Sequence, residues 1–331
     1  MSQHTQAWPK RLAQALSAVL LMSLCAAAMA QAYPSRPIRL VVPWPPGQAT
    51  DLAARFVAQK LAESLGQPLV VDNRAGAGGT IGSDVVAKAL PDGYTLLAGS
   101  SGPISIAPYL SGKLPYDSLK DFTAVSLIAT VPYVLVTQPS FPAANVAEFV
   151  AAMRASPGKY SFASSGAGAT SHLTLELFNM QAQVKATHIP YKGATPALTD
   201  VINGQVAYTF ETLAAVVGHV RSGRLKALAM SSSRRNAALP EVPTVAEAAG
   251  LPGFDMAAWI GYVGPAGMPR DVAARLSAEI GRALQAADLR ERYATLGMEA
   301  VGTTPEGLAQ LMRTEDAKYA NIIKVANIKV E

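Results

Sequence analysis

Three loops of the chain have the composition of anion-binding loops: residues 43–51, 75–82 and 164–172. Each is rich in glycine, proline or serine and lies between an expected strand and an expected helix. Free N–H groups at a helix N-terminus attract anions, and glycine lets an anion approach the backbone closely. Ligands of open α/β sheets bind outside the carboxyl ends of the strands. The three loops therefore predict a site for a small carboxylate or phosphate, although glycine and proline are also ordinary loop residues.

Nucleotide binding is disfavoured by the spacing of the glycines. The loop Gly76-Ala77-Gly78-Gly79-Thr80-Ile81 has isoleucine where G-x-G-x-x-G requires its third glycine. The stretch Gly166-Ala167-Gly168 also lacks a third glycine, and no Gly-Lys-Ser/Thr sequence indicates a phosphate loop. We expect no nucleotide and no other cofactor.

Catalysis is disfavoured by the positions of the histidines. His172, His188 and His219 match no metal-binding spacing, so no metal site is expected. Residues 99–102 do not match the G-x-S-x-G nucleophile motif. Ser171 and His172 are adjacent, and their side chains would diverge on a helix. The sequence favours a protein that is not an enzyme. An exported hydrolase or isomerase that uses residues 164–172 remains the alternative.

Two candidate side chains, His172 and Glu211, have alternative roles. His172 is either a capping residue or a ligand contact, and His188, in a strand-like segment, is expected to be structural. Glu211 follows an expected strand and could accept a hydrogen bond from an amine or hydroxyl of a ligand. The alternative for Glu211 is an exposed acid in a loop.

Composition indicates a folded protein of about two domains, because 331 residues with 50% hydrophobic content can bury a large core. The net charge of +5 arises from scattered basic residues, and no basic run or stripe is present. Nucleic-acid binding is therefore not expected. The chain has one cysteine, Cys25.

The first thirty residues resemble a secretory signal peptide. Lys10 and Arg11 precede an uncharged apolar run, which ends in Ala28-Met29-Ala30. A basic start, an apolar middle and small residues at the end predict cleavage after Ala30 or Ala32 and export to the periplasm. An uncleaved anchor and a lipoprotein modified at Cys25 are alternatives. Cleavage would leave a chain without cysteine and hence without disulfides.

The expected elements alternate between strand and helix, which predicts mostly parallel, doubly wound sheets. We expect the chain to form two α/β lobes with a ligand cleft between them, and to cross between the lobes near Val131 and Phe254. Lobe 1 comprises residues 33–131 and 255–331, and lobe 2 comprises residues 132–254. Strands are predicted at residues 38–42, 69–72, 95–98, 133–137, 160–163, 186–190, 206–210, 225–230 and 259–263. Helices are predicted at 51–64, 81–89, 146–155, 171–180, 270–286, from 195 onward, and from 304 to 325.

The loops and several further motifs resemble the periplasmic solute receptors of tripartite tricarboxylate transporters, the Bug family. The resemblance covers nearly the whole chain from Tyr33. It is carried by Pro43-Trp44-Pro45-Pro46-Gly47-Gln48-Ala49-Thr50-Asp51, by residues 72–82, by Pro91-Asp92-Gly93-Tyr94-Thr95, by Ser171-His172-Leu173, by Pro190-Tyr191-Lys192-Gly193, by Pro196-Ala197-Leu198, by residues 223–229, by Pro243-Thr244 and by Pro265-Ala266-Gly267.

This resemblance implies a type II periplasmic binding protein fold that closes on a small organic acid and passes it to the membrane subunits of the transporter. In the family, the first two loops hold one carboxylate through main-chain N–H groups and bound waters, and the second lobe sets selectivity. By position, the first set is Trp44, Gly47, Ala49, Asp51, Ala77, Gly78 and Thr80. The second set is Ser165, Gly166, Ser171, His172, Tyr191, Gly193 and Glu211. Gln48, Thr50 and Ser100 complete the expected ligand-binding residues.

The chain differs from the family pattern at two positions. Gln48 stands where a second glycine is usual, and Trp44 stands where phenylalanine is usual. A larger apolar wall and an added amide favour a longer or aromatic acid over aspartate or glutamate. We expect a monomer. A ligand-presenting partner of a membrane sensor kinase is a further alternative, since the same closed lobes would be recognised.

Overall fold

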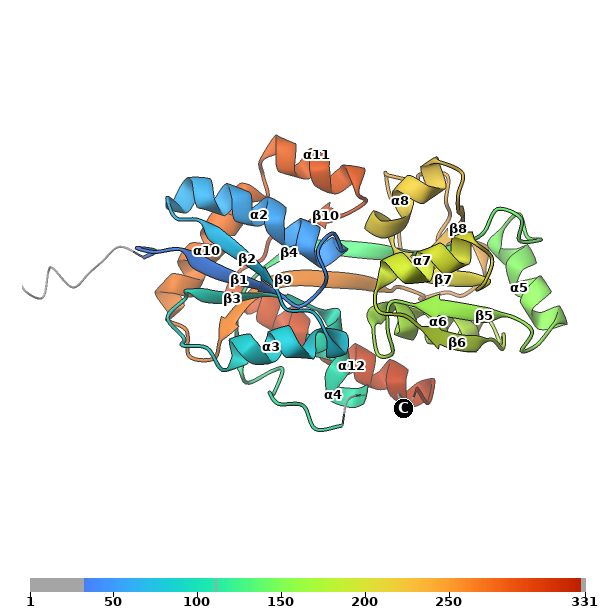
Figure 1. Cartoon of the computed structure of the whole chain (residues 1–331), viewed down its shortest axis with the longest axis horizontal. Coiled ribbons are helices and arrows are strands. Elements are labelled where there is room, and N and C mark those ends of the chain that lie inside the picture. Colours follow the sequence, from blue (N-terminus) through green and yellow to red (C-terminus); the bar gives the residue numbers. More distant parts are fainter. Residues whose placement is uncertain (1–32, 111, 329–331) are drawn as a thin grey trace, which may run out of the picture.

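The computed structural model describes residues 33–110 and 112–328. The expected signal peptide, residues 1–30, lies outside the described residues. The described chain forms an α/β structure of two lobes, and two strands, β4 and β9, run from one lobe to the other (Figure 1). The predicted fold class is confirmed, while the lobe boundaries remain a prediction.

The sheet of lobe 1 is built on three parallel strands. β1 (Ile38–Val42) lies between β2 (Leu69–Asn73) and β3 (Thr95–Ser100). β9 (Ala257–Pro265) then pairs antiparallel with β3 and with β4 (Phe122–Thr137). The parallel strands end at the same edge of the sheet, so the loops that follow β1 and β3 lie close together.

Strand β4 is shared by the two lobes. Its first eleven residues pair with β9, and its last five pair with β7 (Tyr208–Thr212) and β8 (Lys226–Met230). Pro132 lies where β4 changes partners and still pairs with Ala257. Proline has no N–H for a strand ladder, so this position suits a change of partner better than the middle of a sheet.

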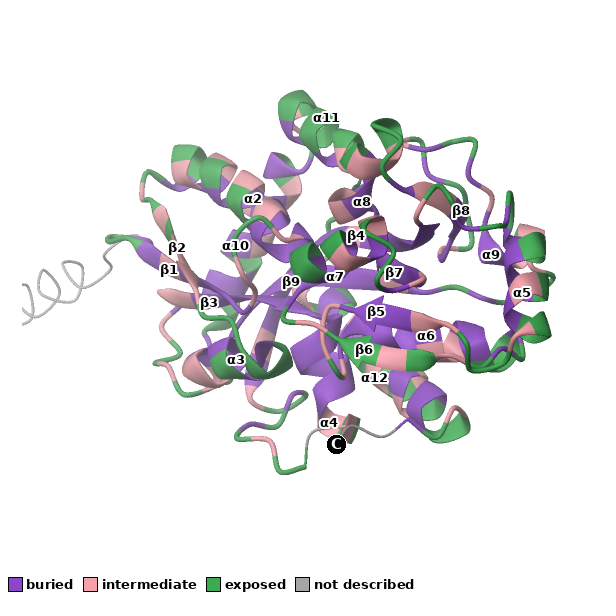
Figure 2. Cartoon of the chain, turned by 45° about the vertical axis from the view of Figure 1, so that its right-hand side comes forward, coloured by how far each residue is buried: buried purple, intermediate pink, exposed green. Residues whose placement is uncertain are grey.

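The sheet of lobe 2 also has a parallel core. β5 (Ser161–Ser164) lies between β6 (Thr187–Pro190) and β7, and all three are parallel. The short strand β10 (Glu299–Ala300) pairs with β4. Figure 2 shows that β4 and β9 are mostly buried, that the edge strand β6 is largely exposed, and that the flanking helices expose their outer faces.

Helices cover both faces of each sheet. In α2, apolar residues at helical spacing, including Ala53, Val57 and Leu61, are fully buried against β1 and α10. The helix ends at Gly66, which adopts a left-handed conformation with φ of 68°. The helical segments are η1 (Ala77–Gly79), η2 (Gly102–Ile106), α2 (Ala49–Leu65), α3 (Thr80–Ala87), α4 (Ala107–Leu110), α5 (Val146–Ala155), α6 (Thr170–Gln181), α7 (Ala194–Ile202), α8 (Leu213–Arg221), α9 (Val245–Ala248), α10 (Arg270–Ala283), α11 (Ala287–Thr295) and α12 (Pro305–Val325).

Helix α12 packs against both lobes. Leu308 and Met312, in its first half, are buried with strand residues of lobe 1. Tyr319 and Ile322, in its second half, are buried in the core that contains Phe149 of lobe 2 (Figure 1). None of the helices in residues 33–110 and 112–328 combines the length and apolarity that crossing a bilayer requires.

Candidate functional site

A cavity of about 410 Å³ lies between the two lobes. Lobe 1 contributes the loop after β1 and the loop after β3, and lobe 2 contributes the loops after β5, β6 and β7. The strands β4 and β9 supply its floor through Tyr133, Ala258 and Ile260. Eight residues predicted from the sequence line it: Trp44, Gly47, Gln48, Ala49, Thr50, Ser100, Ser165 and Glu211.

Four helices begin at this cavity. The first residues of α2, α6, α7 and α8 line it, including Ala49, Thr170, Ala194 and Thr212. Each of these helices follows the carboxyl end of a parallel strand, so parallel pairing brings the four N-termini together. Their positive ends favour a negatively charged ligand by about 0.3–1 kcal/mol each.

The helix N-termini at the cavity carry no side-chain cap. No side chain among the described residues caps α2, α6, α7 or α8. The N-termini of α3, α10 and α11 are also uncapped, whereas α5, α9 and α12 are capped by Asn145, Thr244 and Thr304. The helices at the cavity thus keep N–H groups available for a ligand.

Asp51 holds the first loop in place from behind. It is 1% exposed, and its carboxylate accepts hydrogen bonds from Gly47 N (2.9 Å), Arg55 Nε (2.9 Å) and Asn73 Nδ2 (2.8 Å). Burial alone would raise the pKa of Asp51, but these hydrogen bonds outweigh it and lower the pKa. Asp51 does not line the cavity, so the structure places it as a support for the loop.

Trp44 forms an apolar wall of the cavity. Its indole Nε1 donates a 2.9 Å hydrogen bond to Ser100 Oγ, which joins the loop after β1 to the end of β3. The ring also lies against Gly102, where an added Cβ would be 3.0 Å from a ring carbon of Trp44. Because Gly102 has no side chain, the indole packs directly on the main chain.

Glu211 lines the cavity as a buried acid. It is 1% exposed, and its Oε1 has no hydrogen-bond partner in the part of the chain that the structure describes. Burial raises the pKa of Glu211 to about 7, although hydrogen bonds from Ser165, the Thr212 N–H and Ser171 act in the opposite direction. The interpretation as an exposed loop acid is wrong, because β7 places Glu211 opposite Val134 of β4.

The predicted residues of the loop 164–172 mostly lie behind the cavity wall. Ser171 Oγ is 2.8 Å from Ser165 Oγ and accepts a hydrogen bond from Ser165 N. His172 is 3% exposed and accepts a hydrogen bond from Gly168 N at 3.2 Å. Neither Ser171, His172 nor Gly166 lines the cavity. As expected, Ser171 and His172 form no nucleophile–base pair.

A serine and a histidine do meet in lobe 2, but away from the cavity. Ser164 Oγ lies 2.7 Å from His188 Nε2. The ring of His188 stacks on that of His172 at 3.9 Å between centroids, and on Phe162 at 4.9 Å. Ser164 is fully buried, so a substrate has no access to its hydroxyl. The pair is a structural hydrogen bond beneath the loop.

The glycine-rich loop faces a neighbouring cavity of about 330 Å³. Ala77, Gly78 and Thr80 line this second cavity together with Ala167 and Gly168 of lobe 2. Gly102 lines both cavities. The loop 43–51 and the glycine-rich loop 75–82 are therefore close together. They border two different, neighbouring cavities.

Tyr191 and Gly193 lie at the start of α7 without lining the cavity. The Tyr191 hydroxyl donates a 2.6 Å hydrogen bond to Asp200, and Gly193 has φ of 116°. The sequence did not identify the other cavity residues, which are Ser101, Gly102, Tyr133, Ala169, Thr170, Ala194, Thr195, Leu198, Thr199, Ile202, Thr212, Ala214, Ala215, His219, Arg224, Ala258 and Ile260. The small residues at helix starts among them differ little from ordinary loop residues.

Metal binding finds no support in the described residues. Within residues 33–110 and 112–328, no three His, Cys, Asp or Glu side chains gather as metal ligands would.

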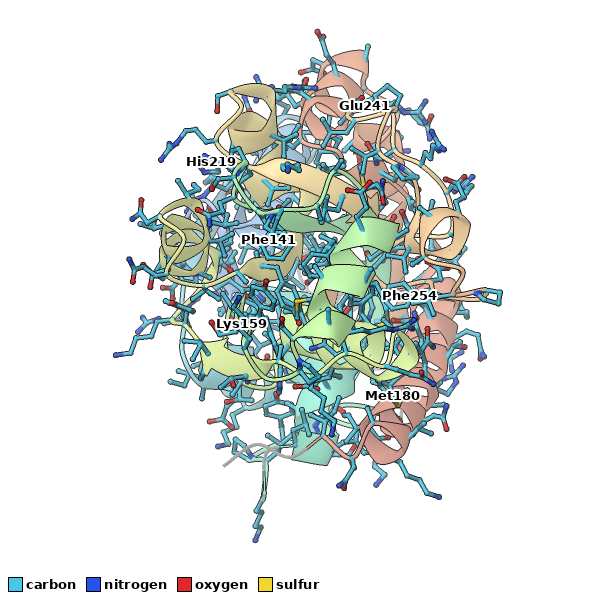
Figure 3. The ribbon with its side chains drawn as sticks, turned by 90° about the vertical axis from the view of Figure 1, so that its right-hand side faces the viewer. Phe141, Lys159, Met180, His219, Glu241 and Phe254 are labelled. Carbon is cyan, nitrogen blue, oxygen red and sulfur yellow. The ribbon has the colours of Figure 1, made fainter. Side chains whose placement is uncertain are left out.

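Figure 3 views lobe 2 end-on, with His219 and Glu241 toward the top and Met180 toward the bottom.

The sequence of this chain matches the family described as "tripartite tricarboxylate transporter family receptor" (TctC) over residues 53–328. The chain belongs to the TctC family. It is 40% identical to protein BugT of Bordetella pertussis over 309 residues, 93% of this chain and 94% of BugT. Members of this family are periplasmic solute receptors, and the alternative of an exported hydrolase or isomerase is set aside.

Two solved structures of TctC-type proteins are similar to this chain. One is R. palustris Rpa4515 with adipate, with a TM-score of 0.86 and 34% identity, covering 90% of this chain and 99% of that chain. The other is MatC (Rpa3494) from Rhodopseudomonas palustris with bound malate. Its TM-score is 0.81 at 36% identity, covering 88% of this chain and 100% of that chain.

Proposed function

We propose that this TctC receptor binds one small organic carboxylate in the cavity between its lobes and delivers it to the membrane subunits of a tripartite transporter. The observation that carries the proposal is the convergence of four uncapped helix N-termini on one cavity. Such termini stabilise a bound anion through their free N–H groups and positive dipole ends. The adipate and malate in the titles of two similar structures support the same ligand class.

The affinity needed by a receptor is within reach of this site. Micromolar binding corresponds to about 8 kcal/mol. Hydrogen bonds from N–H groups to a carboxylate contribute about 1.5–3 kcal/mol each, so three or four of them with some apolar burial supply that energy. The Trp44 ring provides the apolar surface.

The arrangement of the lobes supports delivery of the ligand by hinge closure. Ligand groups that contact both lobes stabilise the closed state over the open state, and a transporter can recognise the closed surface. Strands β4 and β9 connect the lobes and are the elements that would bend (Figure 1).

Calorimetry tests the proposal. The protein is titrated with mono-, di- and tricarboxylates, aliphatic and aromatic, and with the neutral amide of each acid as a control. We expect at least one acid to bind with a Kd near or below about 10 μM, roughly 7 kcal/mol, while its amide does not bind. A folded protein that binds none of the acids would overturn the proposal.

A further inference from the structure

When Glu211 is ionised, the cavity contains an acceptor that a simple carboxylate cannot satisfy. Glu211 Oε1 is buried and unpartnered among the described residues, yet the residue lines the same cavity as the four helix N-termini. A buried polar atom without a partner costs free energy until a donor reaches it. A ligand that is only an anion supplies acceptors and leaves Oε1 unpartnered.

The polar groups around Glu211 leave one of its oxygens without a donor. The neighbouring hydroxyls of Ser165 and Ser171 are 2.8 Å apart and share a hydrogen bond, and the Ser165 N–H donates to Ser171. Ser165, Ser171 and the Thr212 N–H also act on the Glu211 carboxyl and oppose the rise of its pKa. Oε1 still has no partner among the described residues.

Two basic side chains line the cavity, and both come from the far end of α8. Arg224 and His219 are the cationic or basic residues of its described lining. Arg224 follows α8 and His219 lies in its last turn, whereas Glu211 precedes this helix of 9 residues.

We propose that Glu211 selects organic acids that carry a hydrogen-bond donor, a hydroxyl or an ammonium group, near the carboxylate held by the helix N-termini. This inference rests on the proposed function and names the ligand class of the same site. A donor on the ligand pairs with Oε1, while the ligand carboxylate stays with the N–H groups. Acids without a donor bind more weakly because Oε1 then remains unpartnered.

The test uses three matched series that differ only in the donor. They are succinate, malate and aspartate; glutarate, 2-hydroxyglutarate and glutamate; and phenylacetate, mandelate and phenylglycine. Calorimetry of the whole protein is done at about pH 8, where the Glu211 carboxyl is mostly ionised. In the series that fits the cavity, we expect the hydroxy or amino acid to bind about 10- to 100-fold more tightly than the parent acid.

The variant Glu211→Gln separates the two donors. Glutamine keeps the size and one carbonyl acceptor but removes the charge. A bound amino acid should lose about 10- to 100-fold in affinity, and a bound hydroxy acid should lose less than about 10-fold. The parent acid should bind the variant as tightly as or more tightly than it binds the original protein, because a buried charge is gone.

Glu315→Gln is the matched control. Glu315 is also largely buried with one unpartnered oxygen among the described residues, but it lies on α12 and does not line the cavity. This control should leave every affinity unchanged. Equal binding of parent, hydroxy and amino acids, unaltered by Glu211→Gln, would overturn the inference while the proposed function stands. If no acid binds at all, both fail.

Discussion

The side chain of Gln48 lies against the main chain of Gly193 across the cavity. A Cβ placed on Gly193 would be 2.8 Å from Gln48 Nε2. Gln48 precedes α2 in lobe 1, and Gly193 precedes α7 in lobe 2, so two of the four helix N-termini come together where the lobes touch. Glycine at position 193 permits both this contact and the φ of 116°.

The substitution Gly193→Ala should weaken ligand binding. The added methyl group needs the space that Gln48 Nε2 occupies, so the lobes close less far and the contacts of the closed state are incomplete. We expect a loss of about 10-fold in affinity, roughly 1.4 kcal/mol, by calorimetry with whichever acid binds.

The double variant Gly193→Ala/Gln48→Ala separates crowding from backbone strain. Removing the Gln48 amide relieves the crowding, while the strain at residue 193 stays the same. Part of the lost affinity should return. If the double variant binds no better than Gly193→Ala, crowding against Gln48 is not the cause.

Trp44 should report ligand binding by fluorescence. The chain has three tryptophans, Trp8, Trp44 and Trp259. Trp259 is 2% exposed and does not line the cavity, whereas Trp44 does. A ligand beside the indole replaces water there and changes its emission. The variant Trp44→Phe should therefore abolish most of the ligand-induced change, while Trp259→Phe should keep it. A change that persists in Trp44→Phe would show that this ring is not in contact with the ligand.

The sequence located the loops that line the cavity better than it identified the lining residues within them. A loop between a parallel strand and a helix must lie at the carboxyl edge of its sheet, which is why Gly47, Ala49 and Ser165 were found. Tyr191 and Gly193 belong to such a loop too, yet they do not line the cavity. Which side of a loop faces the ligand depends on φ and ψ values that sequence does not specify.

Elements without a clear periodic pattern were missed. The third strand was predicted to end at residue 98, but β3 continues through Ser100 and η2 begins at Gly102. The first eleven residues of β4 were not predicted, and neither was α8, whose start beside Glu211 shapes the cavity. Pro132 concealed the continuity of β4, because a proline ordinarily ends a central strand. Pairing with β9, which is distant in the sequence, keeps β4 extended through Pro132.

The substitution Asp51→Asn should destabilise the protein. An amide cannot accept all the hydrogen bonds that this buried carboxylate receives from Gly47, Arg55 and Asn73. Hydrogen bonds to a charged group contribute about 1.5–3 kcal/mol, so we expect a loss of about 1–3 kcal/mol in urea unfolding. Asp288→Asn, which removes an exposed ion pair with Lys60, should destabilise the protein less than Asp51→Asn does, because solvent screens exposed pairs. Equal effects of the two substitutions would contradict a supporting role for Asp51.

The stabilisation of the fold by Asp51 should depend on pH in a defined direction. The pKa of Asp51 is lowered in the folded protein, so its stabilisation is present above the ordinary pKa of 3.8 and is lost as the pH falls through the folded value. The difference in stability between the original protein and Asp51→Asn should therefore shrink below about pH 4. A difference that stays constant down to about pH 2 would rule out ionisation as its source.

His188 should make the protein less stable in mild acid. Burial, together with the charge of nearby His172, lowers the pKa of His188 to about 3 from an ordinary value of 6.5. The unfolded chain takes up a proton below pH 6.5, whereas the folded protein keeps the imidazole neutral until the pH approaches 3. Its stabilisation is thus complete above pH 6.5 and is lost as the pH falls toward 3.

Urea unfolding at several pH values between about 4.5 and 7.5 measures this effect. One such histidine lowers the free energy of unfolding by at most about 1.4 kcal/mol for each pH unit below its ordinary pKa. His188→Gln keeps a polar group near Ser164 and removes the titration, so the slope should fall by up to that amount. His219→Gln should change the slope less, because only part of His219 is buried and its pKa is lowered less. An unchanged slope in His188→Gln would mean that the imidazole is protonated in the folded protein, contrary to the lowering of its pKa by burial.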